Sequence, residues 1–259
     1  MLKFVKSGVK KAFGHLGFQI RRISPPGRNF GEYGGQVLHV DPFCDIKAML
    51  TRRVTPIIFD VGANIGQTIV KFREQLPASR IHAFEPGIET FKELSVRMNK
   101  VPGLILNNSA LGSTNGTASF FEYNSPVMSS FFPPGTSHWG KIEKIIPVVV
   151  ETLDAYCQRA SVSHIDVLKI DTEGFDLEII RGGHRMLSEN RVNLILTEIL
   201  FSDLYQGAPR FDKLYGFLAD CGFKLVTFYE QYYVDNVLGW TDALFLNDKF
   251  KPAQPEPVN

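Results

Sequence analysis

The residues whose types and spacing could do chemistry begin with an acid and two glycines after an apolar run. Asp60, Gly62 and Gly66 follow the apolar residues at 57–59, and Glu85 follows the next apolar run. Glycines at a strand-to-helix turn let the backbone approach a ligand closely. An acid at the end of the following strand can hydrogen-bond the ribose hydroxyls of a nucleoside. The pattern therefore predicts a nucleoside pocket at the carboxyl edge of a parallel sheet.

The spacing of this turn excludes two common phosphate-binding loops. Asn64 stands where a dinucleotide-binding G-x-G-x-x-G turn needs its second glycine, and no Gly-Lys-Ser/Thr follows, as a P-loop requires. A D-x-G-x-x-x-G turn instead suits a ligand with an adenosine end and a cationic or zwitterionic tail, such as S-adenosylmethionine. Glu85 would then bind the ribose, and the Asp60 region would face the amino-acid end. The structural alternative is a glycine turn of another α/β protein with an unrelated acid downstream.

A second group of candidate residues follows the apolar run at 167–170. Asp171 and Glu173 lie two positions apart, and Gly174 allows a tight turn into the next segment. Two close carboxylates raise one another's pKa, which suits a general base, and their hard oxygens also suit a divalent cation. The structural alternative makes Asp171 or Thr172 the cap of the following helix, with Glu173 on the solvated first turn.

His138 is a third candidate base, because the ordinary pKa of histidine lies near neutral pH. It belongs to the segment 124–144, which has turn residues and no periodicity and is expected to be a long loop. Loops of this length are usually functional, and this one could close over an acceptor. A lone loop histidine is, however, more often exposed to solvent.

Alternating strands and helices must position these residues. The expected strands are 57–60, 80–84, 104–108, 117–123, 148–150, 167–170, 192–197, 223–229 and 242–246, the last two as an antiparallel hairpin; the expected helices are 68–76, 89–99, 152–160, 177–187 and 211–221. Asp60, Glu85, Asp171 and Glu198 then lie at strand ends. In an open α/β sheet ligands bind outside the carboxyl ends of the strands, so we expect these acids to converge on one crevice.

Length and composition indicate one main domain. The chain has 259 residues, 44% of them hydrophobic, and a net charge of +1. This suits a single core and argues against a dedicated nucleic-acid binder. We expect a basic N-terminal helix and lead-in over residues 1–50, the main domain over 51–250 and a flexible tail over 251–259. The three cysteines match no metal-ligand or disulfide spacing, which favours a reducing cytoplasm.

Residues 1–22 combine apolar and basic side chains and contain no acidic residue. This pattern predicts a cationic amphipathic helix, which could lie at the cytoplasmic face of an anionic membrane or on a partner. The alternative is a helix packed on its own domain. No apolar run reaches the ~18 residues that span a bilayer, and we expect no secretion signal.

Five blocks, in this order, resemble the FkbM-type S-adenosylmethionine-dependent methyltransferases. They are Phe59-Asp60-Val61-Gly62-Ala63-Asn64-Ile65-Gly66, Ala83-Phe84-Glu85-Pro86, Asn108-Ser109-Ala110-Leu111-Gly112, Glu151-Thr152-Leu153-Asp154 and Leu168-Lys169-Ile170-Asp171-Thr172-Glu173-Gly174. The resemblance covers about residues 56–200. It implies the α/β fold of class I methyltransferases, which is Rossmann-like and doubly wound, with a mostly parallel seven-stranded sheet and an antiparallel last strand. It also implies S-adenosyl-L-methionine as cofactor.

The resemblance assigns roles position by position. The residues that match the first cofactor loop are Asp60, Gly62, Asn64 and Gly66. Glu85 matches the ribose acid, Asn108 and Ser109 match the region beside the adenine, and Asp171 matches the position that faces the methyl group. Asp171, Glu173 and His138 are thus the candidate catalytic residues.

The resulting expectation is an O-methyltransferase that acts on a hydroxyl of a sugar, glycan, glycolipid or natural product, a small-molecule or glycan acceptor. One alternative is a catalytically silent module that binds a nucleoside and a partner. Another is an N-methyltransferase. Such an enzyme would commonly hold the acceptor nitrogen with a D/N-P-P-Y/F tetrad, and the segment that begins at Asp171 is not one. A divalent metal is possible but not indicated, and the sequence predicts no oligomeric state.

Overall fold

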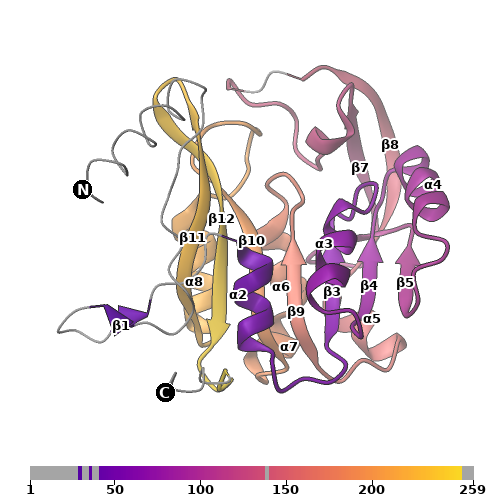
Figure 1. Ribbon diagram of the computed structural model, residues 1–259. Helices are drawn as coiled ribbons and strands as arrows, with labels where there is room; N and C mark the ends of the chain where they lie inside the picture. The colour runs from indigo at the N-terminus through magenta and orange to yellow at the C-terminus, as the bar shows by residue number, and fades with distance from the viewer. Residues whose placement is uncertain (1–28, 31–34, 37–40, 138–139, 253–259) are drawn as a thin grey trace, which may run out of the picture. The chain divides into compact units, whose positions relative to one another are not determined.

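The computed structural model describes residues 29–30, 35–36, 41–137 and 140–252 (Figure 1). One compact unit runs from Asp41 to Gln254. The remaining unit contains the short antiparallel strands β1 (Asn29–Phe30) and β2 (Gly35–Gln36). The basic helix expected in residues 1–22 and nearly all of the tail expected at 251–259 lie outside the described residues.

Seven strands form one sheet in the order β11-β12-β10-β9-β3-β4-β5. Their bounds are β3 Ile57–Val61, β4 Arg80–Phe84, β5 Leu104–Asn107, β9 Ile165–Ile170, β10 Val192–Leu200, β11 Phe223–Val234 and β12 Val237–Asn247. Five neighbouring strands pair in parallel, namely β10, β9, β3, β4 and β5. β12 instead runs antiparallel to both of its neighbours, β10 and β11. The expected mostly parallel sheet with an antiparallel last strand is therefore confirmed.

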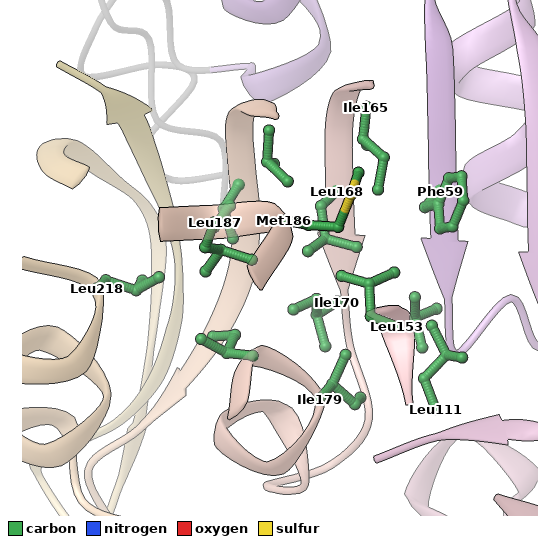
Figure 2. Packing of buried hydrophobic residues seen from close by; sticks show 14 of the residues in the cluster. Phe59, Leu111, Leu153, Ile165, Leu168, Ile170, Ile179, Met186, Leu187 and Leu218 are labelled. Carbon is green, nitrogen blue, oxygen red and sulfur yellow. The ribbon is translucent and has the colours of Figure 1, made fainter. Parts of the chain in front are cut away.

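Helices cover both faces of this sheet. They are α2 Pro42–Met49, α3 Gln67–Gln75, α4 Ile88–Arg97, α5 Leu153–Arg159, α6 Asp176–Gly182, α7 His184–Ser188 and α8 Phe211–Asp220. Apolar residues of α2, α3 and α4 share one core cluster with the sheet, and those of α5 to α8 share another. Figure 2 shows the second cluster, where side chains of α5, α6, α7 and α8 pack against β3, β9 and β10. Strands buried on both faces explain the continuous apolar runs.

The chain order of the strands reverses between β3 and β9. From β3 the chain adds β4 and β5 on one side, and it then crosses to β9 and β10 on the other. Ligands of doubly wound sheets bind at such a switch point, outside the carboxyl ends of the strands.

A three-stranded sheet, in the order β6-β8-β7, is inserted between β5 and α5. Its strands are β6 Ala110–Leu111, β7 Gly116–Tyr123 and β8 Ile142–Glu151, with a 3₁₀ turn, η1, at Pro126–Met128. Figure 1 shows β7 and β8 beyond the carboxyl ends of β4 and β5.

Several element predictions differ from the structure, and among them β11 ends five residues later and β12 begins five residues earlier than expected. β8 begins six residues earlier than expected, because its outward face carries exposed apolar residues, Ile145 and Val149, and this hides the alternation. The single helix expected over 177–187 is two helices, α6 and α7, which meet at Gly183. α2 forms in a segment to which the sequence assigned no element, and Asp41 caps it by accepting from Phe43 N at 2.8 Å.

In the described part of the chain, no helix is both long and apolar enough to cross a bilayer.

Candidate active site

A cleft of about 510 Å³, including its open mouth, lies at the carboxyl ends of β3, β4 and β9. Its wall toward the inserted sheet carries Phe120, Val127 and Phe131. The predicted site residues that line it are Gly62, Asn64, Glu85, Ser109, Asp171 and Glu173. Those that do not line it are Asp60, Gly66 and Asn108. His138 lies outside the described residues.

The turn after β3 is fixed by backbone contacts. The amides of Gly62 and Ala63 both donate to Phe84 O of β4, at 3.1 and 2.9 Å. Gly62 has a φ of +82°, and a Cβ placed there would lie 1.9 Å from Asp171 O. The need for glycine at this position therefore comes from the close approach of the β9 end. The sequence had suggested the close approach of a ligand instead.

Glu85 is held rigidly in the cleft. Its Oε2 accepts from Asn64 N at 3.0 Å and its Oε1 from Gly87 N at 2.9 Å. The residue is only 7% exposed, and burial raises its pKa to about 7 although both hydrogen bonds oppose the shift. Asn108 supports this turn from outside the cleft, because its amide donates to Glu85 O at 2.9 Å. A carboxylate oxygen can accept more than one hydrogen bond, so both oxygens keep capacity for hydroxyl donors.

Asp60 lies beneath the turn and is fully buried. Its Oδ1 lies 3.4 Å from Lys169 Nζ, which also lies 3.1 Å from Asp171 Oδ2. Asp60 Oδ2 is buried and has no hydrogen-bond partner among the described residues. Burial raises the pKa of Asp60, and the Lys169 ammonium opposes that shift.

Carboxylates from three positions meet near the end of β9, where Asp171 and Glu173 line the cleft and Glu198 does not. Carboxylate oxygens of Asp171, Glu173 and Glu198 all lie within 4.8 Å of one another. Tyr205 donates its hydroxyl to Glu173 Oε2 at 2.7 Å, and Ser130 donates to Glu173 O at 2.7 Å. Burial, and then the charge of nearby carboxylates, raises the pKa of Glu173 and of Glu198. Such an oxygen set can hold a shared proton or a hard divalent cation.

Asp171 does not cap the following helix. The first residue before α6 is Phe175, and no side chain caps that end. Asp176 instead anchors the turn, since it accepts from Thr197 at 2.7 Å and from Thr172 at 3.0 Å. The side chain of Asp171 is 42% exposed and is free to meet a substrate. The capping alternative for Asp171 is therefore wrong.

Sequence reasoning missed Lys169 and Tyr205, whereas Glu198 is among the strand-end acids that it expected to converge on one crevice. Lys169 carried a signal, because a lysine in a strand that is otherwise apolar needs a buried partner. Tyr205 carried none, since it lies in the connection between β10 and α8, far along the chain from Glu173.

The fold and the cleft together define a class of protein. The strand order, the single antiparallel strand, the glycine turn after β3 and the buried acid after β4 are those of class I methyltransferases. The family model described as the methyltransferase FkbM domain matches residues 60–225. The chain belongs to the FkbM methyltransferase family and is an S-adenosylmethionine-dependent methyltransferase.

Two relatives of the chain are methyltransferases by name. The 2-O-methyltransferase NoeI of Sinorhizobium fredii is 25% identical over 169 residues, 61% of this chain and 69% of that protein. The hexuronic acid methyltransferase AglP of Haloferax volcanii is 28% identical over 144 residues, 55% of each chain. The match thus spans about half the length of the second relative. Among solved structures, an rRNA methylase from Streptococcus thermophilus matches with a TM-score of 0.46 at 11% identity, over 80% of this chain and 97% of that one.

Proposed function

We propose that this protein methylates a hydroxyl group of a sugar, as a free small molecule or within a glycan, glycolipid or related natural product. The observation that carries the proposal is the single cleft that joins Glu85, a buried acid fit for ribose, to the exposed carboxylate of Asp171. The name of the relative NoeI, a 2-O-methyltransferase, supports transfer to an oxygen, and that of AglP, a hexuronic acid methyltransferase, supports a sugar acceptor.

The residues present fit S-adenosyl-L-methionine, which supplies an activated methyl group when bound. Glu85 would hold the ribose hydroxyls, and Asn64 and Ser109 line the same cleft on either side of it. Asp60 Oδ2, which has no hydrogen-bond partner among the described residues, is buried beneath the turn and would serve as an acceptor for the amino-acid end through a bridging water. Gly62, Gly66 and Asn108 would shape this pocket through the backbone.

The acceptor side would orient the hydroxyl and take its proton. An aliphatic hydroxyl is a poor nucleophile near neutral pH, so a carboxylate should accept its proton as the new bond forms. Asp171 is the exposed acid of the cluster, and Glu173 is buried beside it. We assign proton acceptance to Asp171 and orientation of the acceptor to Glu173. His138 stays a candidate from the sequence.

The test combines binding and turnover. Calorimetry should detect S-adenosylmethionine binding, and labelled cofactor with a panel of neutral sugars, uronic acids, glycolipids and amines should show which acceptors gain a methyl ether. Binding without release of S-adenosylhomocysteine for every acceptor would favour a silent binding module. Methylation of amines alone would favour an N-methyltransferase.

A divalent cation is a second proposal for the acceptor side, because Asp171, Glu173 and Glu198 offer converging oxygens. If the cation takes part, EDTA should abolish turnover, and Mg²⁺ or Mn²⁺ should restore it. Full activity of EDTA-treated, dialysed protein would exclude this role.

We also propose, from the sequence alone, that residues 1–22 contact the cytoplasmic face of an anionic membrane. Co-sedimentation with vesicles containing phosphatidylserine should require these residues. Equal binding of a chain that lacks them would reject the proposal.

A further inference from the structure

Lys169 occupies an unusual place for a lysine. It lies in the central strand β9, whose six residues are all buried, and it is 6% exposed. Its cross-strand neighbours are Asp60 in β3 and Leu196 in β10. Lysine is almost never fully buried unless it is paired, so its position calls for a charged partner.

The Lys169 ammonium meets two carboxylates, of which Asp60 is fully buried and Asp171 lines the cleft. Asp60 lies under the cofactor turn, and Asp171 lies at the mouth on the acceptor side. In the part of the chain that the structure describes, no other lysine or arginine forms an ion pair with either acid. Burial lowers the pKa of Lys169, but the charges of Asp171 and Asp60 outweigh this and hold it above its ordinary value.

The charges around this ammonium are mainly negative. Besides Asp60 and Asp171 themselves, four further acids interact electrostatically with Lys169 or Asp171. They are Glu173 in the turn after β9, Asp176 in α6, Glu198 in β10 and Asp242 in β12. Without a cation here, Asp171 would face these acids unopposed. Its exposed side chain would then turn toward solvent and away from the cluster.

We propose that Lys169 is a positioning residue that links the two halves of the site. It holds Asp171 in the orientation in which its second oxygen can meet the acceptor hydroxyl, and its ammonium also contacts Asp60 beneath the cofactor turn. This inference rests on the proposed methyl transfer, and it adds a residue to which the sequence analysis gave no role.

The test is a double-mutant cycle between Lys169→Met and Asp171→Asn. Methionine keeps an unbranched side chain of similar length and removes the charge. Lys169→Met should lower kcat on the order of 10²-fold, the cost of a misplaced catalytic group, with the acceptor KM nearly unchanged. In the Asp171→Asn background, the same change should cost less than about threefold, because the residues act as one unit. Independent, multiplicative losses would overturn the proposal.

Folding is controlled separately, because Lys169→Met leaves Asp60 buried without a cation, which is strongly destabilising. If the variant fails to fold, the cycle is repeated in the Asp60→Asn background, where that unpaired charge is gone. If Lys169 only neutralises Asp60, Asp60→Asn/Lys169→Met should turn over as fast as Asp60→Asn. The positioning role instead predicts the same large loss of kcat as before.

A cofactor assay separates failure of this inference from failure of the proposed function. If no acceptor is methylated by the unmodified protein, the proposed function fails, and the linkage is then tested by S-adenosylmethionine binding alone. Lys169→Met and Asp60→Asn should each raise the cofactor Kd. The Kd of the double variant should be no higher than that of the single variant that binds the cofactor more weakly. Additive losses, or unchanged affinity in Lys169→Met, would overturn the inference.

Discussion

Asp171 and Glu173 have different surroundings although one residue separates them. Asp171 is exposed and paired with Lys169 at 3.1 Å, so its charge is compensated and its outer oxygen faces the cleft. Glu173 is held by Tyr205 at 2.7 Å, with a left-handed φ of +54°. These environments favour proton acceptance by Asp171 and the fixed, orienting role for Glu173.

Asp171→Asn tests the first assignment. Asparagine keeps the size of the side chain and can still accept from Lys169, but it cannot take a proton as a carboxylate does. Turnover should fall by the ~10²–10⁴ that general base catalysis contributes, while cofactor affinity stays nearly constant. Steady-state kinetics and calorimetry provide both values. Near-normal turnover would move the base to Glu173 or Glu198.

Glu85→Gln tests whether Glu85 binds the ribose hydroxyls of the cofactor. Both carboxylate oxygens accept backbone amides, so a glutamine NH₂ group must face one of these donors. We expect cofactor binding to weaken by roughly 1.5–3 kcal/mol, the range for hydrogen bonds to charged groups. Thermal stability should also fall, since one buried amide loses its partner. An unchanged cofactor Kd, measured by calorimetry, would remove Glu85 from the pocket.

At the scale of elements, the turn after β3 and the end of β9 form one packed unit. Asp171 N donates to Val61 O at 3.0 Å, and Gly62 sits against Asp171 O. The cofactor loop and the candidate base therefore have a shared backbone support, so a change in one displaces the other.

Gly62→Ala should disturb the cofactor loop and the position of Asp171 at once. The new Cβ would need to move Asp171 O, and the left-handed φ would add strain. We expect lower thermal stability together with weaker cofactor binding. Gly216→Ala is the matched control, because in α8 nothing lies within 4 Å of its added Cβ, and it should be neutral or stabilising by up to ~1 kcal/mol. Equal effects of the two changes would contradict this account.

At the scale of the whole molecule, acids gather at the carboxyl edge of the sheet and make stability depend on pH. Burial raises the pKa of Glu85 from 4.5 to about 7, so the folded protein keeps a proton that the unfolded chain has released. The unfolding free energy of the cofactor-free protein therefore loses this contribution as pH rises from 4.5 to 7. Buried His82, with its pKa lowered from 6.5 to about 4, acts in the opposite sense over pH 4 to 6.5.

Comparison with Glu85→Gln isolates the first of these contributions, because His82 is common to both proteins. In urea unfolding at several values from about pH 5 to 8, the stability of the variant relative to the unmodified protein should increase with pH. Parallel stability curves would show that Glu85 does not carry a raised pKa in the folded state.

The alternation of strands and helices from β3 to β10, the antiparallel hairpin and the acids near strand ends were predictable from the sequence. Local patterns predict these features, namely apolar runs of strand length, helical periodicity and glycine turns. The same local signals led to Gly62, Glu85, Asp171 and Glu173, and the family resemblance added Asn64 and Ser109; all six line one cleft. The extent of β8 escaped this reasoning, because exposed apolar residues on its outer face blur the alternation.

The tertiary structure alone decided which of these residues meet. Lys169 reaches Asp60, and Tyr205 reaches Glu173, although each pair is far apart in sequence. Gly62 is required by the backbone of Asp171, whereas its place in the chain suggested a ligand. Such contacts depend on strand order and register, which bring distant segments to one sheet edge, and no local pattern records them. The sequence by itself determined the elements and the acids that they carry, and packing decided how those acids are paired, buried and charged.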